Sequence, residues 1–220
     1  MINIKKFTFN SFAENTYVLW DEETKEALIV DPGCSDTYEE KELEDFISSN
    51  KLNVKYLVNT HCHIDHIFGC GFVKEKFKVP YYAPEKDVPL IEHFDKQVES
   101  VGMEVSIKPP LPDHFITEDL IISLGKSKPV FLYTPGHTPG EYCIYFPQDN
   151  FCITGDVLFQ NSIGRTDFWG GDYNILLESI INKLLVLPDE TIIYPGHSDK
   201  STIGEEKRYN PFLIELINKN

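Results

Sequence analysis

Three groups of histidines, each directly after a run of strand-forming residues, constrain this chain more than any other feature of its sequence. The first group is His61-Cys62-His63-Ile64-Asp65-His66, which follows the apolar run Val54–Thr60. His137 and His197 each follow a strand-like run that ends in a Pro-Gly turn. Four residues of metal-ligand type within six positions indicate a metal site rather than a surface loop that is rich in histidine by chance.

The spacing within the first group indicates how it could divide between two ions. Alternate side chains of extended backbone point the same way, so His61 and His63 can share one metal. Asp65 and His66 lie where the chain turns into the next predicted helix, and they can reach a second metal beside the first.

The second half of the chain supplies three more candidate ligands. A strand-like run followed by Pro-Gly and His occurs twice. This repetition favours metal ligation by His137 and His197 over a structural role for either residue. Asp156 ends another strand-like run, and a carboxylate bridges two cations more readily than an imidazole does. Five histidines and two aspartates are enough for two zinc-like ions with a water or hydroxide between them.

These motifs resemble those of the metallo-β-lactamase superfamily, whose signature T-H-x-H-x-D-H is followed by His, Asp and His. Thr60–His66 match the first run, and His137, Asp156 and His197 follow it, while Asp31-Pro32-Gly33 is similar to an early D-P-G turn of the family. The resemblance covers nearly the whole chain. It implies an α/β fold, an αββα sandwich of two mixed β-sheets with helices on both outer faces, and a single domain over residues 1–220.

Within the superfamily the chain is most similar to the small glyoxalase II type, the hydroxyacylglutathione hydrolases. The similarity lies in Gly155-Asp156-Val157-Leu158-Phe159 and in Gly164-Arg165-Thr166-Asp167-Phe168. It implies a binuclear, metal-dependent thioesterase, with two divalent ions that are zinc, or alternatively iron or manganese. By this resemblance, one metal takes His61, His63 and His137, the other takes Asp65, His66 and His197, and Asp156 bridges them.

The expected reaction is attack on a small-molecule acyl thioester, or a related ester, by a metal-bridging hydroxide. Zinc lowers the pKa of bound water from about 15.7 to about 7, so hydroxide is available at neutral pH. Asp65 and Asp156 are the expected catalytic side chains beside this hydroxide. A thiolate leaves readily, so no strong protein acid is needed.

Arg165 is the expected substrate-binding residue. It is the one cation of the segment 161–171, and a guanidinium suits a substrate carboxylate through two parallel hydrogen bonds. The alternative is that Arg165 pairs with Asp167 or Asp172 and only braces this loop. Glutathione hydrolases of this type carry a Lys and a nearby Tyr after the bridging Asp, where this chain has Arg165 and Asp167.

Three other functions compete with this hypothesis. Persulfide dioxygenases, a sister group with one iron, share the Gly-Arg-Thr-Asp-Phe run, but their last motif reads P-A-H, where this chain has Pro195-Gly196-His197. That difference favours the two-metal hydrolase. A nuclease of the same superfamily is disfavoured by the charge of the chain, and a metal-stabilised, non-catalytic module would not need all seven ligands.

Charge and cysteine content narrow the partners and the compartment. The chain has 20 Lys and Arg against 35 Asp and Glu, a formal net charge of −15, which disfavours binding to nucleic acids and to anionic membranes. Its five cysteines contain no C-x-x-C pair, so we expect reduced thiols. Neither a signal peptide nor a membrane span is apparent, so we expect a soluble, cytoplasmic protein. The sequence leaves the oligomeric state open.

Two further expectations concern residues near the predicted ligands. His93 and His114 lack ligand-type neighbours, so we expect neither to bind metal. Asp31 either accepts a hydrogen bond from a ligand histidine or its neighbour, or merely caps its own turn.

Periodicity and turn residues predict the main elements. The predicted strands are Ile2–Phe9, Thr16–Trp20, Ala27–Val30, Val54–Thr60, Leu120–Leu124, Val130–Tyr133, Tyr142–Phe146, Phe151–Thr154 and Thr191–Tyr194. The predicted helices are Thr37–Ser49, Ile67–Phe77, one near Val88–Val101, Tyr173–Leu187, and Glu205–Ile217 with an interruption at Pro211.

Overall fold

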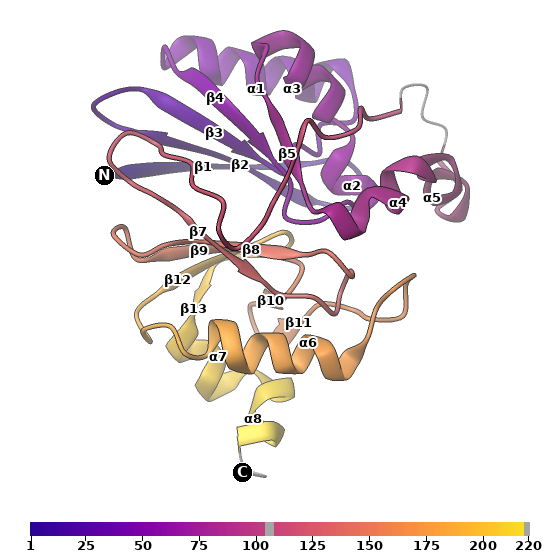
Figure 1. Cartoon of the computed structure of the whole chain (residues 1–220), viewed down its shortest axis with the longest axis vertical. Helices are drawn as coiled ribbons and strands as arrows, with labels where there is room; N and C mark the ends of the chain where they lie inside the picture. The colour runs from indigo at the N-terminus through magenta and orange to yellow at the C-terminus, as the bar shows by residue number, and fades with distance from the viewer. Residues whose placement is uncertain (104–107, 218–220) are drawn as a thin grey trace. The chain divides into compact units, whose positions relative to one another are not determined.

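The computed structural model describes residues 1–103 and 108–217, which group into two compact units (Figure 1). The first unit comprises Met1–Ile116 and Ile122–Lys128, and the second comprises Thr117–Ile121 and Pro129–Asn220. Each unit has its own sheet and its own helices and is described by itself. The single domain expected over residues 1–220 stays a prediction.

The first unit contains a six-stranded mixed sheet in the order β1-β2-β3-β4-β5-β6. Its strands are β1 (Ile2–Phe9), β2 (Glu14–Asp21), β3 (Glu26–Val30), β4 (Asn53–Val58), β5 (Tyr81–Ala83) and β6 (His114–Phe115). The first three strands pair antiparallel, and the strands from β3 to β6 pair parallel. Strand β3 is almost wholly buried, in keeping with its run of aliphatic residues.

Helices cover this sheet. They are α1 (Thr37–Ser49), α2 (Ile64–Ile67), α3 (Cys70–Phe77), α4 (Val88–Glu92) and α5 (Phe94–Ser100), with a 3₁₀ turn at Glu85–Asp87. Helix α1 begins at the cap Asp36, whose carboxylate accepts the amides of Tyr38 and Glu39. Leu43 and Ile47, one turn apart, bury the inner face of α1 in the core of the unit.

The second unit contains a five-stranded mixed sheet in the order β13-β12-β9-β8-β7. Its strands are β7 (Val130–Tyr133), β8 (Tyr142–Phe146), β9 (Phe151–Gly155), β12 (Ile192–Pro195) and β13 (Ser201–Thr202), and a separate hairpin is formed by β10 (Leu158–Phe159) and β11 (Ser162–Ile163). Helix α6 (Tyr173–Ser179) continues as a π-helical segment, Ile180–Leu184, and α7 (Ile203–Tyr209) and α8 (Pro211–Ile217) follow β13.

In each unit two parallel neighbouring strands end side by side. In the first unit Val30, the end of β3, pairs with Val58, the end of β4. In the second unit Gly155, the end of β9, pairs with Pro195, the end of β12. Because the segments that carry candidate ligands follow these strand ends directly, the sheet of each unit brings them to one edge.

Several predicted elements differ from the structure, among them the helix near Val88–Val101, which is the two helices α4 and α5. The strand predicted at Leu120–Leu124 is wrong, since only Leu124 makes a bridge, to Ser127, around a turn at Gly125. The helix predicted at Ile67–Phe77 is two helices, which separate at Gly69. The amide of Gly69 donates to Pro32 O at 2.8 Å, and a Cβ there would lie 2.2 Å from Cys34 Sγ, so the early D-P-G turn packs against this break.

No helix in residues 1–103 or 108–217 is both long and apolar enough to span a lipid bilayer.

Candidate metal centre

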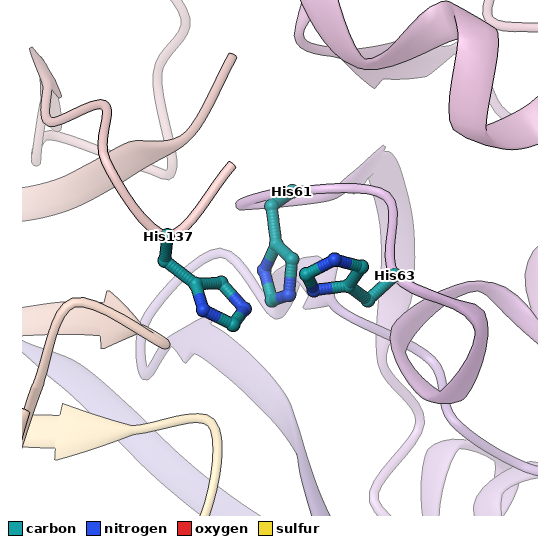
Figure 2. Close-up of side chains that lie close together, drawn as sticks. All are labelled: His61, His63 and His137. Atoms are coloured by element: carbon teal, nitrogen blue, oxygen red, sulfur yellow. The ribbon is translucent and has the colours of Figure 1, made fainter. Parts of the chain in front are cut away.

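The loop that follows β4 carries the first two candidate ligands of the first unit. His61 and His63 alternate along extended backbone, and their rings lie 5.0 Å apart at nearly right angles. Their ligand nitrogens lie within 4.8 Å of each other, and Figure 2 shows the two imidazoles next to one another; it also labels His137, on the loop after β7. Both side chains are buried. The expectation that alternation brings His61 and His63 together is therefore confirmed.

The short helix α2 carries the next two candidate ligands of the first unit. Asp65 and His66 sit side by side on it, with 3.7 Å between Asp65 Oδ2 and His66 Nε2. The rings of His61 and His66 lie 4.1 Å apart. The first unit thus collects four of the seven predicted ligands on a single loop and helix.

Two consecutive hydrogen bonds, from His61 to Thr60 and from Thr60 to Asp31, fix the tautomer of His61. The Thr60 hydroxyl donates to Asp31 Oδ2 at 2.6 Å, so it can only accept from His61 Nδ1, which lies 3.1 Å away. His61 therefore carries its proton on Nδ1 and presents the lone pair of Nε2, as a metal ligand must.

Asp31 also faces a second candidate ligand. Its Oδ2 lies 3.3 Å from His66 Nδ1, while its Oδ1 accepts the amide of Thr60 at 2.7 Å and the side-chain amide of Asn59 at 3.1 Å. Asp31, His61 and His66 also form a group of possible metal donors by proximity. Because the Asp31 oxygens already accept these hydrogen bonds, we expect Asp31 to orient the candidate ligands rather than to bind an ion. Asp31 therefore contacts a candidate ligand histidine, His66, and Thr60, the neighbour of another, as expected.

Gly33 and Asn10 hold the early turn against helix α2. The Asn10 side-chain amide donates to the carbonyls of Gly33 and Asp65, at 2.9 and 3.1 Å. A Cβ on Gly33 would lie 2.1 Å from Glu14 Oε2 and 2.6 Å from Asp65 O, so only glycine fits.

Glu14 is a fully buried carboxyl that the sequence analysis missed. Its Oε2 accepts from the Thr16 hydroxyl at 2.8 Å, and its Oε1 lies 3.9 Å from His66 Nδ1. Burial raises the pKa of Glu14 well above its ordinary value, and the nearby His66 acts in the opposite direction. No local signal marks this residue, since a glutamate that opens a strand is normally exposed.

In the second unit His137 is held by the loop that contains Arg165. His137 Nδ1 donates to Arg165 O at 2.7 Å, which leaves Nε2 as the ligand atom. Gly136, with φ 133°, precedes His137, and a Cβ on Gly136 would lie 2.3 Å from the backbone nitrogen of Leu176 in α6.

Asp156 lies between two histidines of the second unit. Its Oδ2 is 3.5 Å from His137 Nε2 and 3.6 Å from His197 Nε2. The amide of Asp156 donates to Oε1 of Glu141 at 2.7 Å, and Glu141 is fully buried. The sequence analysis also missed Glu141, which fixes the backbone that carries Asp156.

These separations fit metal binding. Four ligands at about 2.0 to 2.1 Å from a tetrahedral zinc lie about 3.3 to 3.4 Å from one another. The observed separations of 3.5 to 3.7 Å, in the pairs Asp65–His66, His137–Asp156 and His197–Asp156, need shifts of only a few tenths of an ångström. The donor set, imidazole with carboxylate, suits zinc, iron and manganese.

The remaining candidates stay apart from these groups. His93 lies between α4 and α5, and His114, exposed in β6, stacks at 4.8 Å on Tyr82. In the described part of the chain neither histidine belongs to a group of metal donors.

All five cysteines are buried and reduced. Burial raises the pKa of the Cys62 thiol well above its ordinary value.

Arg165 makes a two-pronged ion pair with Asp167. Nε and Nη2 donate to the two carboxylate oxygens, both at 2.7 Å. The hydrogen bonds from Arg165 lower the pKa of Asp167 to about 2. Asp172 instead caps α6, accepting the amides of Asn174 and Ile175. The ion pair that was expected if Arg165 braces its loop is thus present, and its partner is Asp167.

Comparison with known proteins identifies the family. The family model of the metallo-β-lactamase superfamily matches residues 10–197. The chain belongs to this superfamily, and the donor groups described above support a metal-dependent hydrolase.

Several relatives are similar over their whole length. Hydroxyacylglutathione hydrolase GloC of Haemophilus influenzae is 41% identical over 214 residues, which are 96% of this chain and 98% of that protein. The crystal structure of BLEG-1 B3 metallo-β-lactamase has a TM-score of 0.86 at 35% identity and covers 97% of this chain and 99% of its own. TTHA1623 in a di-iron-bound form has a TM-score of 0.84 at 33% identity, covering 95% and 100%. These structures confirm the predicted metallo-β-lactamase fold class.

Proposed function

We propose that this chain is a two-metal hydrolase that cleaves a small-molecule acyl thioester. The observation that carries the proposal is the position of Asp156, whose Oδ2 lies at nearly the same distance from the Nε2 atoms of His137 and His197. One carboxylate shared between two histidines is the arrangement needed for a ligand that serves two ions.

The seven ligands divide as the family resemblance implies. His61, His63 and His137 would hold one ion, Asp65, His66 and His197 would hold the other, and Asp156 would bridge the two ions. The tautomers of His61 and His137 support metal ligation by these two residues, because both present Nε2. Zinc, iron and manganese all suit these donors, and the di-iron form of TTHA1623 keeps iron among the candidates.

The chain's own residues orient the site. When bound, the ions would make hydroxide available at neutral pH and polarise the acyl carbonyl. Asp31 and Thr60 keep His61 and His66 in position, and Glu141 fixes the backbone of Asp156. Asp65 and Asp156 are the catalytic carboxylates of the proposal. A thiolate leaves without a strong acid, so no protein acid is needed at the sulfur.

A thioester substrate is supported by the similarity to a protein named hydroxyacylglutathione hydrolase, over almost the full length of both chains. Arg165, one residue after Gly164 and bonded through its carbonyl to His137, is the proposed handle for a substrate carboxylate. A formal net charge of −15 disfavours polyanionic substrates such as nucleic acids. A mononuclear iron persulfide dioxygenase is the alternative.

Metal analysis with two activity assays tests the proposal. The purified protein should bind two divalent ions per chain and hydrolyse a hydroxyacylglutathione thioester. Asp156→Asn should lose most activity and part of its metal, because the amide is a weaker bridging ligand. The control Asp189→Asn removes an exposed carboxylate that pairs with Lys207, and it should behave as wild type. One iron per chain with sulfide-dependent oxygen uptake would instead establish the dioxygenase.

A further inference from the structure

The backbone around His63 is held by side chains of a later segment of the first unit. His63 lies in the loop between β4, which ends at Val58, and α2, which begins at Ile64, and its backbone is extended, with φ −66° and ψ 153°. The segment 85–100, which contains the 3₁₀ turn, α4 and α5, supplies the side chains that bond to this loop. The loop and this segment both belong to the first unit.

Gln97, on α5, bonds to the peptide groups on both sides of His63. Its Oε1 accepts the amide of Ile64 at 3.1 Å, and its Nε2 donates to Cys62 O at 3.3 Å. The Cys62 carbonyl belongs to the peptide group before the Cα of His63, and the Ile64 amide belongs to the peptide group after it. Because these two planar groups set the direction of the Cα–Cβ bond, Gln97 fixes the direction in which the imidazole leaves the backbone.

Gln97 is itself held in place. Its Nε2 also donates to Leu90 O at 2.9 Å, so the oxygen and both N–H groups of the amide are used. The bond to Leu90 joins α5 to α4, and Ile91, Phe94 and Val98 of these helices lie in the core of the first unit. Phe94 and Val98 already supply the buried apolar contacts of α5, so packing alone does not call for an amide at position 97.

Asp87 holds the same loop at a second point. Its Oδ2 accepts the amide of Cys62 at 3.2 Å, and its side chain is fully buried. The amide and the carbonyl of Cys62 and the amide of Ile64 are thus bonded to two side chains, those of Asp87 and Gln97. A metal site needs its donors placed within about 0.5 Å, and loop backbone held in this way is suited to that tolerance.

We propose that Gln97 is the positioning residue of His63 and directs its imidazole toward the ion that His63 would share with His61 and His137. This inference rests on the proposed function and adds to it a residue outside the histidine and aspartate motifs. Gln97 acts through the two peptide groups of His63 and not as a ligand. Loss of the Gln97 amide should therefore weaken the binding of one ion and spare the other.

Hydrogen exchange of the metal-free protein tests the contact itself. Gln97→Met keeps the length of the side chain but loses its amide, so the backbone amide of Ile64 should exchange about 5-fold to 10-fold faster, the effect of one lost hydrogen bond. The amide of Leu57 in β4, which donates to Pro80 O at 3.1 Å, reports any general loss of stability, and its rate should change less. The control Gln148→Met places the same substitution at an exposed glutamine, in the turn before β9, and should change neither rate.

Metal titration tests the positioning. Competition with a chelator should resolve two dissociation constants for the wild type, and Gln97→Met should raise that of one ion by about 10-fold and leave the other unchanged. His63→Ala should weaken the same ion. In a protein that already carries His63→Ala, Gln97→Met should not change the affinity for the remaining ion, because a residue that acts through an imidazole has no effect once that imidazole is removed. Gln97→Asn, whose amide is one methylene shorter, is a milder variant that should weaken the same ion.

Three results would overturn the inference. If Ile64 exchanges at its wild-type rate in Gln97→Met, the bond from Ile64 to Gln97 does not hold this backbone. If Gln97→Met weakens both ions equally, or neither, Gln97 has only a general structural role. If it weakens the remaining ion in the His63→Ala protein, it acts through another residue. A wild type that binds two ions but hydrolyses no thioester would refute the proposed function instead, and the same titrations would still test Gln97.

Discussion

Replacing Gly164 by alanine should disturb the candidate metal centre without removing any candidate ligand. The new Cβ would lie 1.8 Å from the carbonyl oxygen of Asp156 and 3.3 Å from Cβ of His137. Real Cβ atoms essentially never come within 3.0 Å of such an atom, so the two backbone segments must separate by about 1.2 Å. The obstacle is backbone, which cannot rotate aside as the end of a side chain can.

That separation has two consequences of known size. Overpacking of this kind costs about 1 to 3 kcal/mol of unfolding free energy. The same movement would stretch the 2.7 Å bond from His137 Nδ1 to Arg165 O beyond bonding range, at a further cost of about 1 kcal/mol. Loss of a hydrogen bond that orients a ligand imidazole also lowers metal affinity by about 10-fold to 100-fold.

Denaturant unfolding and metal titration would measure these effects. We expect Gly164→Ala to lose about 2 to 4 kcal/mol and to bind metal more weakly. Gly71→Ala is the matched control, because its Cβ would meet only Pro110 Cδ, at 3.8 Å, within helix α3. This control should gain about 0.5 to 1 kcal/mol from a less flexible unfolded chain. Wild-type stability and metal affinity in Gly164→Ala would refute the reasoning.

Four further outcomes follow from the same contacts. Asp31→Asn should lose about 2 to 4 kcal/mol and bind metal more weakly, because the new amide must face donors from Thr60 or His66; an unchanged metal titration would contradict this. His93→Gln and His114→Gln should leave metal content unchanged by elemental analysis, and a loss in either would show that we divided the histidines wrongly. NMR titration should give the Asp167 carboxyl a pKa of about 2, and this pKa should rise toward its ordinary value in Arg165→Gln. Because the pKa of Asp167 is lowered in the folded state, the ionised carboxylate stabilises the fold above the ordinary pKa. This stabilisation is lost as the pH falls toward 2. Chelation should lower the melting temperature, because a ligand at 100 times its Kd stabilises the folded state by about 2.7 kcal/mol; equal melting with and without chelator would argue against bound metal.

The sequence predicted several of the long elements well. Strands β1, β7 and β8 and helix α1 begin and end at the predicted residues, because each has a clear periodic pattern and turn residues at its ends. The two- and three-residue strands, such as β5 and β6, escaped prediction. Their pairing depends on neighbouring strands rather than on their own residues.

Errors arose where tertiary contacts override local preference. The apolar run Leu120–Leu124 has strand propensity, but its Ile121 is 79% exposed, and Gly125 turns the chain with φ 58° where a Cβ would meet Asp21. The predicted helix Ile67–Phe77 breaks at Gly69 because a residue 35 positions earlier, Cys34, packs there. No window of local sequence contains either contact.

The candidate site likewise contains residues that the sequence indicated and residues that it did not. Histidine and aspartate spacing indicated the donors, since a donor must be a particular residue type. The carboxylates Glu14 and Glu141 escaped notice because a glutamate in the sequence does not show whether it is buried or what it accepts. Asp31 was identified as a candidate only because its Pro-Gly turn is a motif in its own right.

Both units position their ligands by the same physical means. In each unit a glycine lets two backbone segments approach more closely than a Cβ allows: Gly33 beside Asp65 O, and Gly164 beside Asp156 O. In each unit a buried carboxylate then accepts the amide of a ligand or of its neighbour, Asp31 from Thr60 and Glu141 from Asp156. A metal site needs its donors placed within about 0.5 Å, and backbone fixed by such contacts meets that tolerance better than a flexible loop. In the proposed centre the histidine motif therefore supplies the donors, while the two glycines and two carboxylates fix the positions of the backbone that carries them. A chain with the motif but without these four residues would not be expected to build the same centre.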